Sequence, residues 1–174
     1  MTHIASKLIA ALSAATLLLA GCGGGDDNQT TGGGGGATLT LSATTPGAFA
    51  TTIDLATATA KGNNTRAADA FSSVAYCEVF WENANGANGK KYAVQVYFRQ
   101  GDKLPINVSV VDPATGWVIF NNASGAAITG LTVDTTAKTI VFNNKVLAGT
   151  GTDIGTLAGT VGFQANTGTP ACGA

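Results

Sequence analysis

The sequence predicts an all-β domain, and three observations support this prediction. Apolar side chains recur at every second position, polar turn sequences separate these runs, and no segment has the helical period of about 3.6 residues. Short alternating strands joined by polar turns are typical of an antiparallel β-sandwich or a small barrel-like domain. Residues 37–174 have the length of a single domain with one hydrophobic core.

The first part of this domain contains short alternating segments. Five apolar residues there fall at alternating positions: Leu39, Leu41, Phe49, Ile53 and Leu55. The stretch from Ala56 to Ala70 is polar and small and includes glycine and asparagine. We therefore expect a long loop there, with one helical turn near residues 66–70.

The strongest strand patterns follow this loop. The alternation predicts strands at Val74–Glu82, Lys91–Arg99, Leu104–Val111, Trp117–Asn121, Leu131–Val133, Thr139–Phe142, Lys145–Leu147 and Leu157–Phe163. Turn-forming sequences rich in Gly, Asn and Asp separate the first four of them, at residues 83–89, 101–103 and 112–116. These short separations predict antiparallel hairpins.

The turns also suggest a register for each hairpin. A pair between Glu82 and Lys91 would set Trp81 opposite Tyr92, Val79 opposite Val94 and Cys77 opposite Val96, all facing inward. The next two turns would set Phe98 opposite Ile106 and Val110 opposite Val118.

This register places an unusually aromatic set of side chains on the other face of the sheet. The candidate binding residues there are Tyr76, Phe80, Tyr97, Val111 and Trp117. They would form a platform on which a sugar ring or a partner's apolar surface can stack. The alternative is that a second sheet or the 56–70 loop covers them, since contiguous exposed apolar patches are uncommon.

Residues 1–21 have the organisation of a signal peptide. His3 and Lys7 precede an apolar run, residues 8–20, that is too short to span a bilayer comfortably. The sequence Leu19-Ala20-Gly21-Cys22 at its end resembles the lipobox of bacterial lipoproteins. The resemblance implies cleavage before Cys22, a diacylglycerol on Cys22 Sγ and an acylated α-amine. The alternative is an ordinary secretory signal in which this cysteine is incidental.

The resemblance also implies a location. Acyl chains on Cys22 would make the lipid bilayer a partner, because each buried methylene contributes about 0.8 kcal/mol. Gly23 follows the cysteine where an aspartate would favour retention at the inner membrane, so we expect the outer membrane of a Gram-negative bacterium, although Asp26 and Asp27 lie close by. Residues 22–36 are glycine-rich and predict a flexible tether with a reach of about 20 Å.

Two cysteines remain if a lipid occupies Cys22. An oxidising compartment favours a disulfide between Cys77 and Cys172. In the chain-entropy model, closing so long a loop stabilises the fold by about 4–5 kcal/mol. The alternative is a buried free thiol at Cys77 and an exposed one at Cys172.

The composition argues against most catalytic chemistry. Without residues 1–21 the chain has no histidine, and eight lysines and arginines face ten acidic residues, which disfavours nucleic-acid binding. Ser-His-Asp triads and histidine-based zinc sites are therefore excluded. Glu78 and Glu82 lie about 13 Å apart along a strand, beyond the 5–9.5 Å or so of a glycosidase pair. No calcium-binding loop motif occurs.

We therefore expect a membrane-anchored envelope protein with a non-catalytic binding or structural β domain and no cofactor. Its ligand would be a carbohydrate or another envelope protein, recognised by the aromatic face. One alternative is an accessory subunit of a larger envelope assembly that docks through a sheet edge or the same face. A more distant alternative is a hydrolase that acts on envelope polymers.

We predict that Cys22 is the acylated residue. Metabolic labelling with palmitate should tag the wild-type protein, whereas Cys22→Ser should stay unlabelled because it lacks the thiol that accepts the diacylglycerol. The variant Cys172→Ser serves as the control and should label like the wild type. Equal labelling of wild type and Cys22→Ser would contradict the lipoprotein interpretation.

Overall fold

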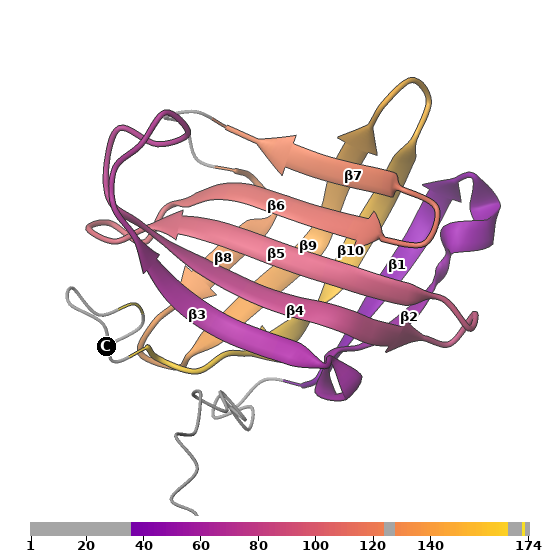
Figure 1. Ribbon diagram of the computed structural model, residues 1–174, viewed down its shortest axis with the longest axis horizontal. Helices are drawn as coiled ribbons and strands as arrows, with labels where there is room; N and C mark the ends of the chain where they lie inside the picture. The colour runs from indigo at the N-terminus through magenta and orange to yellow at the C-terminus, as the bar shows by residue number, and fades with distance from the viewer. Residues whose placement is uncertain (1–35, 124–127, 167–171, 173–174) are drawn as a thin grey trace, which may run out of the picture.

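The computed structural model describes residues 36–123, 128–166 and 172, and most of this part of the chain is β-structure (Figure 1). The strands are β1 Thr38–Thr45, β2 Thr51–Asp54, β3 Ala60–Arg66, β4 Tyr76–Gly86, β5 Lys91–Arg99, β6 Pro105–Asp112, β7 Trp117–Asn122, β8 Leu131–Asp134, β9 Thr139–Gly149 and β10 Ile154–Gly162. Two 3₁₀ helices, η1 Gly47–Phe49 and η2 Leu55–Thr57, flank β2. The all-β prediction is confirmed. The predicted signal peptide, Cys22 and the tether up to residue 35 lie outside the described residues.

The sheet closes on itself into a barrel of eight antiparallel strands. Their order is β1-β2-β4-β5-β6-β7-β9-β10, and β10 pairs with β1 to complete the ring. In Figure 1, β4 to β7 cross the near side of the barrel, and β8, β9, β10 and β1 lie behind them. β3 and β8 are additional strands, paired with β4 and β9 respectively. Of the two architectures that the sequence left open, the structure therefore has the barrel.

Alternating side chains fill the interior of the barrel. On β5, Tyr92, Val94, Val96 and Phe98 all have no exposed surface. Strands β1, β9 and β10 contribute inward leucine, isoleucine and phenylalanine side chains in the same way. An eight-stranded barrel is just wide enough to be filled by its own side chains. Each such side chain stabilises the fold by about 1.5–3 kcal/mol, so the interior is the main source of stability.

The register between β4 and β5 differs from the predicted one by two residues. Trp81 lies opposite Val94, and Lys91 lies opposite Asn85, so the predicted pair of Glu82 with Lys91 is wrong. At the turn the difference is three residues, because the hairpin closes at the pair of Asn85 with Lys91. A bulge between Trp81 and Ala84, with Asn83 at a φ of 56°, takes up one residue and leaves a difference of two along the rest of β4. Because the shift is even, the side chains predicted to face inward on β4 still do so.

The other two predicted hairpin registers also need correction. β5 and β6 pair as predicted from Ala93 to Tyr97, with Val96 opposite Val108, but a bulge then sets Phe98 opposite Pro105 instead of Ile106. Between β6 and β7 the register is displaced by one residue, so Val110 lies opposite Ile119 instead of Val118.

The displacement between β6 and β7 results from the turn at their junction. Asp112 accepts hydrogen bonds from the backbone N–H of Ala114 (2.9 Å) and the hydroxyl of Thr115 (3.0 Å), and Gly116 closes the turn with a φ of 73°. Asp112 therefore pairs with Trp117, and the connection is one residue shorter than we expected. An odd shift turns every side chain of β7 to the opposite face.

Two segment predictions are corrected as well. The stretch predicted as a loop with a helical turn near residues 66–70 contains β3, which pairs with β4 along its whole length. Its small polar side chains do not alternate in hydropathy, because β3 lies outside the barrel ring. The segments predicted as separate strands, Thr139–Phe142 and Lys145–Leu147, form the single strand β9, with a bulge opposite residues 157–159 of β10.

Cys77 and Cys172 form the predicted disulfide, with their Cα atoms 5.6 Å apart. The bond holds Cys172 against β3 and β4. The side-chain amide of Asn63 on β3 strengthens this contact, since it donates to the carbonyls of Gln164 (2.8 Å) and Cys172 (2.9 Å). Phe163 packs beside Phe98 at this end, with ring centroids 6.1 Å apart.

Removal of the disulfide should lower the free energy of unfolding by about 4–5 kcal/mol, because the bond closes a loop across 95 positions of the chain. The double variant Cys77→Ala, Cys172→Ala tests this by denaturant unfolding. A reducing agent should destabilise the wild type by a similar amount and leave the double variant unchanged. A wild type that is insensitive to reduction would contradict the prediction.

Candidate functional site

The predicted aromatic face is only partly present. Tyr76, Phe80, Tyr97 and Val111 lie on the outer face of β4, β5 and β6, but only the last three are half-exposed, and Tyr76 is buried. The ring of Phe80 lies over Gly62 of β3, where a Cβ atom would come within 2.5 Å of it. The tyrosines are diagonal neighbours whose ring centroids are 5.5 Å apart.

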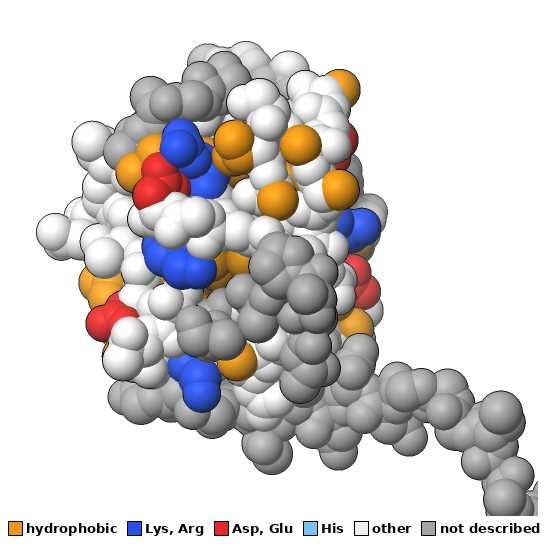
Figure 2. All heavy atoms as spheres, turned by 90° about the vertical axis from the view of Figure 1, so that its left-hand side faces the viewer, with side chains coloured by type: hydrophobic (Ala, Val, Ile, Leu, Met, Phe, Trp, Pro, Cys, Tyr) orange, Lys and Arg blue, Asp and Glu red, His pale blue; other side chains and the backbone are white. Residues whose placement is uncertain are grey.

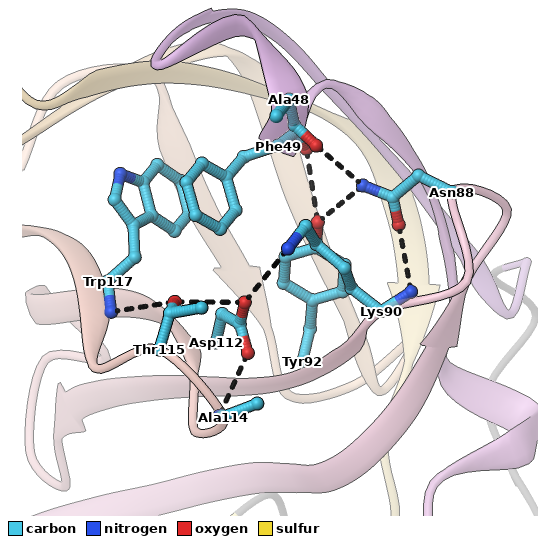
Figure 3. A network of polar contacts seen from close by, with 9 residues as sticks. All are labelled: Ala48, Phe49, Asn88, Lys90, Tyr92, Asp112, Ala114, Thr115 and Trp117. Carbon is cyan, nitrogen blue, oxygen red and sulfur yellow. Dashed lines mark hydrogen bonds and ion pairs between the residues drawn. The ribbon is translucent and has the colours of Figure 1, made fainter.

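Trp117 does not belong to this face, and the prediction that it does is wrong. Its side chain is 6% exposed and points into the barrel, where it stacks on Phe49 with ring centroids 4.1 Å apart and planes 4° from parallel (Figure 3). The one-residue displacement of β7 described above causes this reversal. Trp117 is therefore a core residue.

Trp117 is part of a network that closes one end of the barrel (Figure 3). Lys90 Nζ lies 3.5 Å from Asp112 Oδ2 and 4.8 Å from the centre of the Phe49 ring. The hydroxyl of Tyr92 donates to the carbonyl of Phe49 at 3.2 Å. Burial alone would raise the pKa of Asp112, but the turn hydrogen bonds and the Lys90 charge together lower it. The network joins three connections and has a structural role.

A polar cluster centred on Glu78 lies on the outer face of the barrel, near the start of β4. This residue of β4 is 6% exposed. Arg66 at the end of β3 donates from Nε to Glu78 Oε2 at 2.7 Å, and the hydroxyl of Tyr97 and the amide of Gln95 donate to Oε1 at 3.3 and 3.4 Å. The hydrogen bond to Glu78 raises the pKa of Arg66. Both carboxylate oxygens thus accept hydrogen bonds, which a buried charge requires.

Asp69 folds the chain after β3 back over this face. Its Oδ1 accepts from the backbone N–H of Phe71 (2.8 Å) and Ser72 (3.0 Å), and its Oδ2 accepts from the hydroxyl of Tyr76 (2.9 Å). The hydrogen bond from Ser72 and then that from Tyr76 lower the pKa of Asp69. This turn fixes the direction in which Phe71 leaves the backbone.

Phe71 thereby joins the two tyrosines in an outer aromatic cluster, which comprises Phe71, Tyr76 and Tyr97. The Phe71 ring meets Tyr97 edge to face at 5.3 Å and Tyr76 at 5.6 Å. Burial, followed by the hydrogen bond to Asp69, raises the pKa of Tyr76 to about 12. Burial and the neighbouring Glu78 raise the pKa of Tyr97.

A pocket of about 310 Å³ opens beside the outer aromatic cluster. It lies between the 70–74 segment and the adjoining ends of β5, β6 and β7. Its lining residues are Ala70, Phe71, Ser72, Ser73, Val74, Arg99, Ile106, Asn122 and Ala123. Arg99 is held in place by Asp102, with Nη2 and Oδ2 2.7 Å apart. Figure 2 views this end of the barrel, where basic and acidic side chains lie among hydrophobic ones.

This pocket is not among the sites predicted from the sequence. Phe71 is the only aromatic residue between Ala56 and Ala75, and it follows an aspartate that forms turns. That signal could have indicated an aromatic side chain held by a turn. Nothing in the local pattern indicates that residues 70–74 lie beside Arg99 and Asn122, because this contact depends on the path of the chain after β3.

Other kinds of site find no support in the part of the chain that the structure describes. No group of three or more His, Cys, Asp or Glu side chains there could hold a metal ion. Within the same residues, no helix has the length and apolar character needed to cross a bilayer. Comparisons with protein-family models, curated proteins and solved structures give no match for this chain.

Stability should fall as the pH rises above 10, because the folded state holds the tyrosine protons more tightly than the unfolded chain does. For Tyr76 the pKa rises from 10.0 to about 12, so up to about 2–3 kcal/mol of stability is lost across that interval. Denaturant unfolding between pH 9 and 12 measures this loss. Tyr76→Phe should reduce the slope, and an unchanged slope would contradict the assignment.

Proposed function

We propose that the protein is a lipid-anchored binding protein of the bacterial envelope, held to the outer membrane through Cys22, with a non-catalytic β-barrel that binds carbohydrate. The lipobox and the glycine-rich sequence after it support the anchor and the tether. The observation that carries the binding role is the pocket of about 310 Å³ beside the outer aromatic cluster. Its volume lies at the lower end of the range for small-molecule sites, about 300–1,000 Å³.

The lining of the pocket favours a ligand that is both apolar and rich in hydroxyl groups. Phe71 and Val74 offer apolar surface, on which the C–H face of a sugar ring can pack, and Ile106 is buried behind them. Arg99 and Asn122 supply side-chain hydrogen-bond donors beside it. Asp102 accepts from one nitrogen of the Arg99 guanidinium, which has further N–H groups.

The outer aromatic cluster fixes the position of one wall of the pocket. Phe71 belongs to both, and its contacts with Tyr76 and Tyr97 hold its ring in one orientation before a ligand arrives. A preformed aromatic surface loses little conformational freedom on binding. Glu78 orients Tyr97 by accepting a hydrogen bond from its hydroxyl. The Glu78 carboxylate accepts hydrogen bonds from three side chains in total. This engagement favours a binding role over the alternative of a hydrolase.

We expect the mature protein to bind soluble envelope oligosaccharides and Phe71→Ala to weaken binding at least about tenfold, because the variant removes the stacking surface. Titration calorimetry against neutral and acidic oligosaccharides measures the affinity and separates the role of ring stacking from that of the Arg99 charge. Arg99→Gln should lose affinity mainly for acidic sugars.

Two control variants match these changes. Phe120→Ala removes an exposed phenylalanine elsewhere on the outer face, and Lys103→Gln removes a cation from the β5–β6 turn outside the pocket lining. Both should bind like the wild type. The absence of binding by the wild type, or an equal loss in Phe71→Ala and Phe120→Ala, would overturn the proposal.

The second candidate function is that of an accessory subunit in a larger envelope assembly. The observation that favours it is an exposed flank of the barrel, where Phe120 of β7, Val146 of β9 and Ile154 of β10 are 44%, 51% and 39% exposed and β1, β7 and β10 contain no charged residue. This flank supports contact with another protein, whatever the pocket binds.

A further inference from the structure

The outer face of β5 and β6 carries a strip of uncharged side chains. The two strands run side by side along the near side of the barrel and pair over most of their length (Figure 1). The charged residues of these strands stand at their ends: Lys91 and Arg99 begin and end β5, and Asp112, which is buried, ends β6. The outer strip comprises the half-exposed residues Ala93, Gln95, Tyr97, Asn107, Ser109 and Val111.

The outer strip begins at the rim of the pocket. The Tyr97 ring contacts Phe71, which lines the pocket. Asn107 lies opposite Asn122, which lines the pocket as well. Tyr97 and Asn107 also lie opposite one another, so together they form the rim on the side of the strip. A ligand that is longer than the pocket can continue over this rim onto the outer strip.

The outer strip offers hydrogen-bonding groups, and two of them are held in place. The buried carboxylate of Glu78 accepts from the amide of Gln95 at 3.4 Å and from the hydroxyl of Tyr97 at 3.3 Å, so it holds both side chains on this face. Gln95 keeps its amide oxygen and a second N–H for a ligand. Within the described part of the chain, the side chains of Asn107 and Ser109 have no hydrogen-bond partner. Amide and hydroxyl groups beside an aromatic ring suit a ligand that is rich in hydroxyl groups.

We propose that the outer strip is a second part of the sugar-binding site, and that the ligand is a neutral, linear oligosaccharide. One end of the sugar chain occupies the pocket, and the next units lie over Asn107 and Ser109. Sugar hydroxyl groups both donate and accept hydrogen bonds, as the side-chain amides of the strip do. A strip without charge offers no complement to a carboxylate or phosphate, which favours neutral units there. The inference rests on the proposed carbohydrate site and adds the length and charge of its ligand.

The dimensions of the outer strip favour an extended sugar chain. The steps from Asn107 to Val111, at about 3.3 Å per residue, give a length of about 13 Å. Two sugar rings in an extended chain, such as a β-1,4-linked one, span a similar distance. The path follows the strands, so it bends less than a path around the barrel would. A coiled chain, such as an α-1,4-linked one, would turn away from the strip.

Titration calorimetry with the full mature chain tests the proposal. The probes are cello-oligosaccharides and chito-oligosaccharides of two to five units, with malto-oligosaccharides of the same lengths as the coiled comparison. From disaccharide to tetrasaccharide, the affinity should rise at least about tenfold in one or both extended series, because the added units form hydrogen bonds with the strip. The affinity for malto-oligosaccharides should stay nearly constant with length.

Two variants on the outer strip locate the added contacts. Asn107→Ala should weaken binding of the tetrasaccharide about three- to tenfold and leave that of the disaccharide unchanged, because only the longer ligand passes the rim. Ser109→Arg should have the same effect by filling the strip with a long side chain. The control is Asn143→Ala, which removes an exposed asparagine from β9 and should bind like the wild type. All three side chains face outward, so thermal unfolding should stay near that of the wild type.

The outcomes separate this inference from the proposed function. Equal wild-type affinities for disaccharide and tetrasaccharide, or an unchanged tetrasaccharide affinity in both variants, would overturn the extended site. The pocket would still bind sugar in that case if Phe71→Ala weakens every probe. Hyaluronan oligosaccharides, which are acidic, complete the panel, and a larger gain with length in that series would overturn the neutral ligand. Binding of hyaluronan alone would overturn this inference and leave the carbohydrate site, whereas no binding of any probe would overturn both.

Discussion

The structure depends on the pairing of its first strand with its last. β1 lies between β2 and β10, and its inward leucines, Leu39 and Leu41, are buried only because β10 completes the wall beside them. An open sheet of the same strands would leave the interior side chains exposed along both edges. Closure also removes the unpaired edges within the ring, which otherwise recruit other strands.

Closure also explains the two strands that lie outside the ring. β4 and β9 are the longest strands, and each has two partners along one side. β2 pairs with β4 only at Asn85 and Gly86, and β3 pairs with the rest, from Tyr76 to Glu82. In the same way β7 pairs with one end of β9 and β8 with the other. β3 and β8 therefore provide backbone hydrogen-bond partners for β4 and β9 along the parts of these strands that β2 and β7 do not pair with. β3 also places Arg66 beside Glu78, so the polar cluster of the candidate site follows from the way the barrel closes.

Much of this fold could be predicted from the sequence, because burial on one face imposes alternation. β5 has the predicted bounds, and the pairing of Cys77 with Cys172 follows from the inward parity of Cys77 and the shortage of other partners. The turns were less predictable. The bulge at Asn83 and the hydrogen bonds of Asp112 depend on local backbone geometry that hydropathy does not report. One displaced residue was enough to move Trp117 from the predicted outer face into the core. The pocket beside Phe71 was beyond prediction for a different reason, since it requires segments that are distant in sequence to meet.

The disulfide has a consequence for the order of events in the life of the chain. Because synthesis proceeds from the N-terminus, β1 is complete long before β10 exists, and Cys77 waits for Cys172, which lies 95 positions further along the chain. Both the closure of the barrel and its disulfide therefore depend on segments that are made after the other strands. A chain that stops before β10 can neither close the ring nor form the disulfide. Until these segments have been made, the interior strands have to be kept from aggregating by something other than their own fold.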